Sequence, residues 1–121
     1  MAGRDQNLQQ KMTDKIVVLS TCNSAAQAEL VARALVEERL AACVNIVPGI
    51  RSIYRWKDQV EDAVEWLLVI KSRRDLMDGL RLAIGKIHAY EVPELLALPV
   101  VDGADNYIAW LDRELKPVAD A

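Results

Sequence analysis

The chain is organised around the stretch Ala42-Cys-Val-Asn-Ile-Val-Pro-Gly-Ile-Arg-Ser-Ile-Tyr-Arg-Trp56, which is rich in β-branched and aromatic residues. A second stretch follows almost at once, Val60-Glu-Asp-Ala-Val-Glu-Trp-Leu-Leu-Val-Ile-Lys71. It first alternates between apolar and polar residues, with Glu61 and Glu65 on the face expected to meet solvent, and is then continuously apolar. Alternation is typical of a half-buried strand, and a continuous apolar run of a strand covered on both faces. The two stretches therefore predict one long β-hairpin, joined by a turn at Lys57-Asp58-Gln59.

The predicted arms are longer than the usual strand of about 5–6 residues, so the hairpin should extend beyond the sheet to which it belongs. Inside the first arm, Pro48-Gly49 predicts a bulge or a bend, because proline cannot donate to a β-ladder and glycine tolerates unusual dihedrals. An overhanging and partly apolar ribbon on a small domain needs another surface to cover it. We therefore expect an obligate oligomer.

Length and composition describe one ordinary globular domain. The chain has 121 residues, of which 52% are hydrophobic, and a net charge of -3. We expect a disordered arm over residues 1–14 and a single domain over residues 15–121. The sequence has no basic patch suited to nucleic acid, no apolar run near the roughly 20 residues of a membrane span, and no apolar signal-peptide core. A cytoplasmic protein without nucleic-acid or membrane partners is expected.

The rest of the chain predicts alternating strands and helices. A short apolar strand leads into a helix with Ser24 as its N-cap and the Gln27 side chain reaching back to it. After the hairpin come a second helix capped around Ser72 or Asp75, a loop, a last strand and a third helix. The expected bounds are Ile16–Ser20 for the first strand, Leu40 for the end of the first helix, 88–94 for the loop, Leu95–Val101 for the last strand, and Asp105 to just before Pro117 for the third helix.

The element order β-α-β-β-α-β-α predicts an α+β domain of the ferredoxin-like type, with an additional C-terminal helix, an antiparallel sheet and a long central hairpin. Right-handed crossovers place the strands in the order 4-1-3-2. Pro99 fits this order, because a proline within a strand needs an edge position. Cys22, His88 and Glu94 then lie at one end of the sheet. Cys43 lies at the other end, which argues against a disulfide with Cys22.

One segment resembles a known family. The stretch His88-Ala-Tyr-Glu-Val-Pro-Glu-Leu-Leu96 resembles the H-P-Y-x-x-P-E-[LI] motif of the CutA family, the divalent-cation tolerance proteins. The resemblance covers about Lys15 to Lys116 and includes several further segments in the same order. These segments are Leu40-Ala-Ala-Cys-Val-Asn-Ile-Val-Pro-Gly49, Ser52-Ile-Tyr-Arg-Trp56, Leu98-Pro-Val100 and Tyr107-Ile-Ala-Trp-Leu111.

The resemblance implies a tight homotrimer of ferredoxin-like subunits, similar in architecture to PII signalling proteins, in which long hairpins and edge strands pair between subunits. It implies a role in tolerance of divalent metals, with copper binding attributed to some bacterial members and no catalytic activity assigned. In copper-binding members the ligands are a cysteine and two successive histidines. Here Ser20 stands at the cysteine position and Ile87 at the first histidine position, and only His88 matches. Ala89 replaces the proline of the motif.

His88, Glu94 and Cys22 are the candidate metal ligands, because nitrogen, carboxylate and thiolate groups suit a transition metal such as Zn or Cu. Each also has a structural interpretation: His88 as a helix C-cap, Glu94 as an acceptor for backbone amides, and Cys22 as a small core residue. The aromatic residues on the hairpin are more often packing or interface anchors than a ligand cage. The candidates for lining an intersubunit cleft are Tyr54, Trp56, Tyr90 and Glu94.

Three functions compete. The first is a non-enzymatic, trimeric protein of divalent metal (copper) tolerance that binds metal ions directly or responds to them. The second is a PII-like regulatory module that binds a small anion or metabolite in the intersubunit clefts, although no Gly-rich phosphate loop supports it. The third is an enzyme that uses Cys22 or His88, which ranks last because the sequence pairs no nucleophile with a base.

Overall fold

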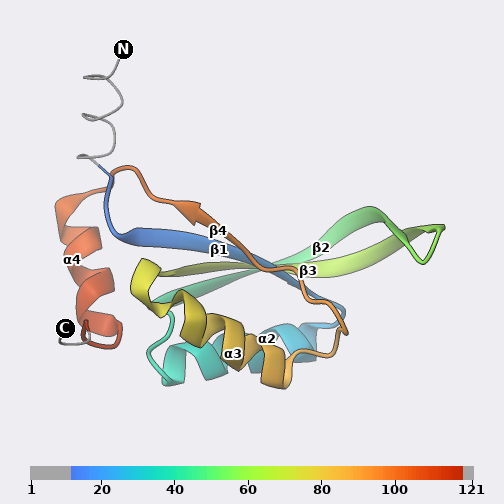
Figure 1. The fold of residues 1–121 in the computed structure, drawn as a ribbon, viewed down its shortest axis with the longest axis horizontal. Coiled ribbons are helices and arrows are strands. Elements are labelled where there is room, and N and C mark those ends of the chain that lie inside the picture. Colours follow the sequence, from blue (N-terminus) through green and yellow to red (C-terminus); the bar gives the residue numbers. More distant parts are fainter. Residues whose placement is uncertain (1–11, 119–121) are drawn as a thin grey trace, which may run out of the picture.

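The computed structural model describes residues 12–118 of the chain. Its strands form one antiparallel sheet in the order β2-β3-β1-β4, which confirms the predicted ferredoxin-like topology and the edge position of Pro99. Two of the helices, α2 and α3, pack against one face of this sheet, and α4 lies at the end opposite the hairpin tip (Figure 1). The elements are β1 (Lys15–Cys22), α2 (Ala25–Glu37), β2 (Cys43–Trp56), β3 (Gln59–Arg73), the short 3-10 helix η1 (Arg74–Leu76), α3 (Met77–Ile87), β4 (Leu96–Pro99) and α4 (Asp105–Glu114).

The long hairpin is formed by β2 and β3, and it overhangs the sheet as predicted. The last residue of β1, Cys22, pairs with Trp66, so the part of β3 before Trp66 has β2 as its only partner in the sheet. The register shifts between Val47 and Ile50, at the predicted Pro48-Gly49 bulge. The turn itself is tighter than predicted. It consists of Lys57 and Asp58 alone, both with positive φ as in a type I′ turn, and Gln59 already belongs to β3.

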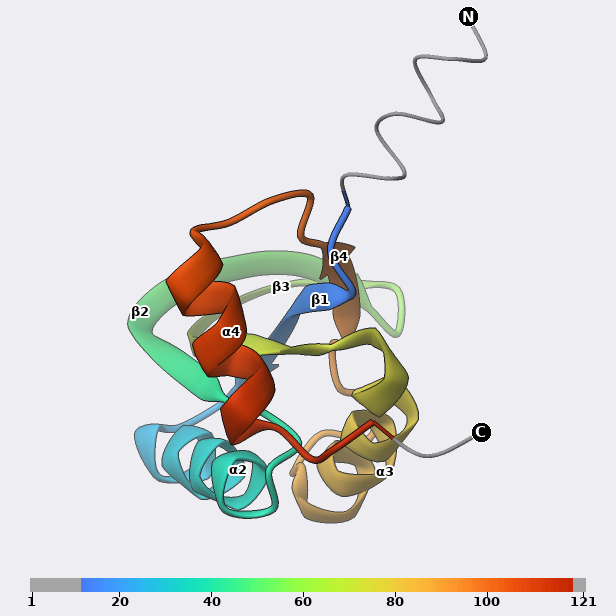
Figure 2. The same cartoon turned by 90° about the vertical axis from the view of Figure 1, so that its left-hand side faces the viewer.

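The core lies between the sheet and the helices. Alternate residues of β1 and β3 point toward α2 and α3, which lie side by side below the curved sheet in Figure 2. Both helices present the apolar stripes expected from their 3.6-residue period. The best-buried apolar side chains are Val18, Leu68 and Ile70 of the sheet, Ala28, Val31 and Leu35 of α2, and Leu80 and Ile84 of α3.

Several predicted boundaries of helices and strands were wrong, and for the two helices the reason is local. The first helix ends at Glu37 rather than about Leu40, because Arg39 adopts a positive φ of 59° and turns the chain. The second helix begins at Met77 rather than near Ser72 or Asp75, because β3 continues to Arg73 and η1 intervenes. The last strand is shorter than predicted, at Leu96–Pro99.

The N-cap of α2 was predicted correctly, but the role of Gln27 was not. Ser24 Oγ accepts a hydrogen bond from the Gln27 backbone N–H at 3.1 Å. The Gln27 side chain does not reach back to Ser24. Its Nε2 instead donates to the Ile87 carbonyl at 2.6 Å, so it ties the start of α2 to the end of α3.

Most of the predicted N-terminal arm, residues 1–11, lies outside the described residues. Its last part is ordered: the Thr13 backbone N–H and hydroxyl both donate to the Val100 carbonyl, at 3.1 and 2.8 Å, and the Arg74 backbone N–H donates to the Asp14 carbonyl at 2.8 Å. The ordered domain therefore begins before the predicted Lys15.

Two buried cations join the sheet to α4. Lys15 and Arg73 face each other across β1 and β3, and each is only 2% exposed. Asp112 of α4 places one carboxylate oxygen 3.1 Å from Lys15 Nζ and 3.2 Å from an Arg73 terminal nitrogen. Asp14 and Asp75 provide further carboxylates to Lys15 and Arg73 respectively. Figure 2 shows α4 crossing the end of the sheet where this cluster lies.

The second face of the sheet, here called the open face, carries a group of apolar residues along its middle. Residues paired in register share a face, and the partners of Val17 and Leu19 on β4 are Leu98 and Leu96. Both leucines are about half exposed. The helices α2 and α3 lie on the other side of the sheet (Figure 1). The apolar residues that the register assigns to the open face are Val17, Leu19, Val47, Leu67, Val69, Leu96 and Leu98.

Candidate functional site

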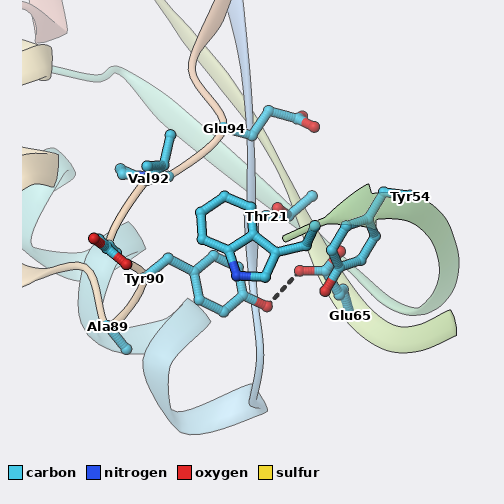
Figure 3. Close-up of a pocket in the computed structure, with 10 residues that line it drawn as sticks. Thr21, Tyr54, Glu65, Ala89, Tyr90, Val92 and Glu94 are labelled. Carbon is cyan, nitrogen blue, oxygen red and sulfur yellow. Dashed lines mark hydrogen bonds between the residues drawn. The ribbon is translucent and has the colours of Figure 1, made fainter. Parts of the chain in front are cut away.

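A cavity of about 460 Å³ lies where the overhanging hairpin meets the loop between α3 and β4 (Figure 3). Its volume is in the usual range of small-ligand pockets, about 300–1,000 Å³. Aromatic rings and carboxylates dominate its walls, and among the described residues its lining includes no Lys, Arg or His. The lining residues are Tyr54, Trp56 and Tyr90, the glutamates Glu65, Glu91 and Glu94, and Thr21, Ala89, Val92 and Pro93.

The two strands of the hairpin and the loop after α3 hold these side chains in place. Tyr54 and Trp56 are two residues apart on β2, so both leave the same face of the hairpin. Glu65 of β3 shares this face, because its partner in register, Ile50, has the same parity as Tyr54 and Trp56. The opposite wall is the loop after α3, from which Tyr90 points toward Glu65 in Figure 3. The site therefore joins parts of the chain that are far apart in sequence.

Glu65 is the most buried charged residue of the cavity, at 5% exposed. Its Oε2 accepts a hydrogen bond from the Tyr90 hydroxyl. Burial, together with the hydrogen bond and charge of Glu65, raises the pKa of Tyr90 above its ordinary value, so the tyrosine keeps its proton. The prediction of a solvated face was thus correct for Glu61, which is exposed, and wrong for Glu65. The loop carrying Tyr90 covers Glu65. The sequence of β3 alone does not predict this contact, because Tyr90 lies in a distant segment.

His88 anchors the start of this loop through both ring nitrogens. The Tyr90 backbone N–H donates to Nδ1 at 3.0 Å, so Nδ1 carries no proton. The proton of the neutral ring is therefore on Nε2, which donates to the Thr21 carbonyl at 2.6 Å. His88 is also the C-cap residue of α3, in extended rather than helical conformation. As arranged, neither ring nitrogen has a free lone pair.

Cys22 lies beside His88, with its Sγ 3.8 Å from Nε2. The thiol is fully buried, and burial, followed by the nearby charge of Glu65, raises its pKa to about 11. It is therefore protonated at neutral pH. Metal binding and nucleophilic attack both require the thiolate. Cys22 and Cys43 are both free thiols, in agreement with their predicted placement at opposite ends of the sheet.

The structure brings two of the three predicted metal ligands together. Cys22 and His88 are neighbours, whereas Glu94 lies on the cavity wall and is exposed. Within residues 12–118 no group of three or more His, Cys, Asp or Glu side chains is arranged to hold a metal ion. A metal at His88 would have to displace one of its two hydrogen bonds and deprotonate Cys22. These residues, as placed in one chain, do not fit a preformed metal site, and direct metal binding stays a prediction.

The predicted cleft residues Tyr54, Trp56, Tyr90 and Glu94 all line the cavity. Sequence reasoning missed Glu65, which closes one wall. None of the helices in residues 12–118 is long and apolar enough to cross a membrane.

Fold and site together define a small ferredoxin-like α+β protein with an aromatic and acidic cavity beneath an overhanging hairpin. A family model described as "CutA1 divalent ion tolerance protein" matches residues 16–114. The chain therefore belongs to the CutA1 divalent ion tolerance family, as the sequence motifs predicted.

Individual relatives agree with this assignment. The divalent-cation tolerance protein CutA of Thermus thermophilus is 48% identical over 95 residues, covering 78% of this chain and 92% of that protein. The chloroplastic CutA of Arabidopsis thaliana is 44% identical over 106 residues, covering 88% of this chain, and the human CutA is 43% identical over 101 residues, covering 84% of it. The chain spans only 58% of the plant protein and 56% of the human one.

Solved structures of the family have the same fold. The divalent cation tolerance protein of Thermus thermophilus superimposes with a TM-score of 0.82 at 45% identity, covering 84% of this chain and 99% of that one. The structure of CutA1 from Oryza sativa gives a TM-score of 0.85 at 39% identity, covering 89% of this chain and 99% of that one.

Proposed function

We propose that this protein acts in tolerance of divalent metal ions, copper among them, as a non-enzymatic homotrimer in the cytoplasm. The observation that carries the proposal is family membership: the model for divalent ion tolerance proteins matches residues 16–114, and the Thermus thermophilus relative is named for divalent-cation tolerance. The absence of catalysis is supported by the Cys22–His88 pair. The Cys22 thiol is buried and protonated, so it is not an active nucleophile. The His88 imidazole donates from Nε2 to the Thr21 carbonyl and accepts at Nδ1 from the Tyr90 backbone, so neither nitrogen is free to act as its base.

The apolar open face supports assembly from copies of this chain. Leu96 and Leu98 are 57% and 48% exposed, and on the overhang Ile53 and Val60 are 68% and 66% exposed. Exposed apolar surface of this extent on a small domain marks an interaction site. The edge strand β4 and the overhanging part of the hairpin also carry backbone groups that a second subunit can pair.

The mass of the assembly tests this proposal. Light scattering at micromolar concentration should give three times the 13.5 kDa of one chain. Leu98→Asp, which places a charge on the open face, should dissociate the trimer, whereas Leu82→Asp is a matched control because Leu82 is also exposed (67%) but lies on α3. In cells that lack their own homologue, the wild type and Leu82→Asp should restore growth in copper, and Leu98→Asp should not. A monomeric wild type, or full tolerance with the dissociated variant, would contradict the proposal.

Direct binding of metal is a finer question, which calorimetric titration of metal-free protein with Cu(II) and Zn(II) answers. Stoichiometric binding that disappears in His88→Ala would assign the tolerance function to a metal site at His88. Binding that is absent, or unchanged in the variant, would assign it to an indirect route.

A second candidate function is a regulatory module that holds a small ligand, as proposed from the resemblance to PII proteins. The cavity between the hairpin and the 88–95 loop favours it, because its volume suits a small molecule and its walls are aromatic. The lining residues of the cavity also bear on the charge of such a ligand.

A further inference from the structure

We propose that the cavity binds a small organic ammonium ion, with the cation held between aromatic faces and the Glu65 carboxylate. This inference rests on the second candidate function above, a ligand-binding module, and is independent of metal tolerance. The sequence suggests a small anion or metabolite as the ligand of such a module, whereas the ligand proposed here is a cation.

The charge of the walls is the first argument. Glu65, Glu91 and Glu94 line the cavity, and its described lining contains no basic side chain. An anion entering this space would meet carboxylates with no cation from the same chain to offset them, whereas a cation would be attracted. The acidic residues do not stand alone, since three aromatic rings share the walls.

The aromatic rings are the second argument. Tyr54, Trp56 and Tyr90 contribute rings from two sides, and a ring face attracts a cation within about 6 Å of its centre. In one subunit Trp56 is 40% exposed and Tyr54 is 43% exposed, so both rings have surface that their own chain does not cover. An aromatic lining also suits the alkyl part of an organic cation, which a hydrated metal ion does not offer.

The buried carboxylate of Glu65 is the third argument and selects a cation with N–H groups. Glu65 is 5% exposed, yet its only hydrogen-bond partner among the described residues is the Tyr90 hydroxyl, which donates to Oε2. A carboxylate oxygen accepts about two hydrogen bonds, so Oε1 has unused capacity. An ammonium N–H placed there would compensate a charge that is otherwise largely desolvated.

The test uses the assembled full-length protein and three probes of similar shape: n-butylammonium, n-butanol and butyrate, titrated at constant ionic strength. Binding is followed by the indole N–H signals in nitrogen–proton correlation spectra. We expect a saturable shift of the Trp56 signal with butylammonium, at least tenfold weaker binding of butanol, and no binding of butyrate. The Trp110 signal on α4 is the internal control and should not move.

Glu65→Gln should weaken butylammonium binding at least tenfold, because it removes the charge but keeps an oxygen that can accept from Tyr90. Glu37→Gln, an equal change of charge on the exposed side of α2, should change the affinity less than twofold. A near-ultraviolet circular dichroism spectrum identifies any variant with altered folding. Trp56→Leu, at a partly exposed position, gives a second route, followed by calorimetric titration because this variant lacks the reporting indole: it should weaken butylammonium binding several-fold and change butanol binding less.

Three results would overturn the proposal: no saturable binding of butylammonium, equal or tighter binding of butyrate, or an affinity unaffected by both Glu65→Gln and Trp56→Leu. Saturable butyrate binding at Trp56 would refute the cation while preserving a ligand-binding module. If none of the three probes bound, the proposal of a cation ligand would be refuted. The proposed role in metal tolerance would be unaffected, because the growth assay tests it separately.

Discussion

The cluster that joins α4 to the sheet gives the sharpest prediction. Asp112→Asn removes the negative charge that Lys15 and Arg73 share while keeping the shape of the side chain. Breaking one partner of a fully buried ion pair costs about 3–5 kcal/mol. Two features reduce this figure: the Asp112 side chain is 51% exposed, and Asp14 and Asp75 still neutralise the two cations. We therefore expect the free energy of unfolding to fall by about 1–2 kcal/mol.

The pH dependence of this loss follows from the pKa of Asp112. Burial is the largest single influence and raises it, but the hydrogen bonds and charges of Lys15 and Arg73 together bring it below the ordinary 3.8. A carboxyl with a lowered folded pKa contributes stability above its unfolded pKa, and this contribution is lost as the pH falls through the folded pKa. The difference between wild type and variant should thus be full at neutral pH and shrink below about pH 4.

Urea denaturation at one fixed protein concentration, followed by circular dichroism, measures both effects. The control is Asp58→Asn, the same substitution in the exposed hairpin turn, where asparagine tolerates the positive φ of 64°. It should change the free energy of unfolding by less than about 0.5 kcal/mol. If Asp112→Asn were as stable as Asp58→Asn, or if its deficit were undiminished at pH 3, the role assigned to Asp112 would be refuted.

Three further predictions concern a buried serine, the two cysteines and the hairpin turn. Ser20→Ala should raise the free energy of unfolding by about 1 kcal/mol, because Ser20 Oγ is buried without a hydrogen-bond partner; calorimetric melting that shows destabilisation would contradict this. Iodoacetamide at pH 8 should label Cys43 and spare Cys22, whose pKa is raised to about 11 by burial and by the charge of Glu65, and mass spectrometry of peptides would expose the opposite pattern. Since that pKa lies above the ordinary 9.0, the protonated thiol contributes stability below pH 9 that is lost as the pH rises toward 11. The double substitution Lys57→Asn with Asp58→Gly should stabilise the hairpin by about 0.5–1 kcal/mol. Both positions have positive φ, which asparagine and glycine adopt more readily than lysine and aspartate. An unchanged melting temperature would count against a strained turn.

Much of the fold was predictable because the residues that decide it act locally. Pro99 restricts its strand to an edge, Pro48-Gly49 places the bulge, and the continuous apolar run after Glu65 marks the central part of β3. These features depend on backbone chemistry and on the period of the side chains, both of which can be read along the chain. They sufficed for the strand order and the overhang.

The parts that were missed depend on contacts between distant segments. Glu65 is buried by Tyr90, which lies 25 positions away, and the Gln27 side chain bonds Ile87, which lies 60 positions away. Lys15 and Arg73 look like ordinary surface cations until Asp112 covers them. No pattern within a strand or a helix specifies such pairs, so the place of Glu65 in the cavity could not be derived from the sequence. Tyr54 and Trp56 could be placed there because they lie on the predicted hairpin, and Tyr90 and Glu94 because they lie in the segment that resembles the family motif.

The two hydrogen bonds of His88 have a consequence for motion. They fix the first turn of the 88–95 loop to β1 and to its own backbone, and Tyr90 adds a bond to β3. The other end of the loop is held where Leu96 pairs with Leu19 of β1, so we expect the rim from Glu91 to Glu94 to be its most mobile part. Amide hydrogen exchange should be slow at Tyr90 and faster at Val92. A ligand can then enter by displacing this rim while the Tyr90–Glu65 wall stays in place. In the seven-residue segment His88–Glu94, the second half therefore controls access to the cavity and the first half holds the wall that contacts the ligand.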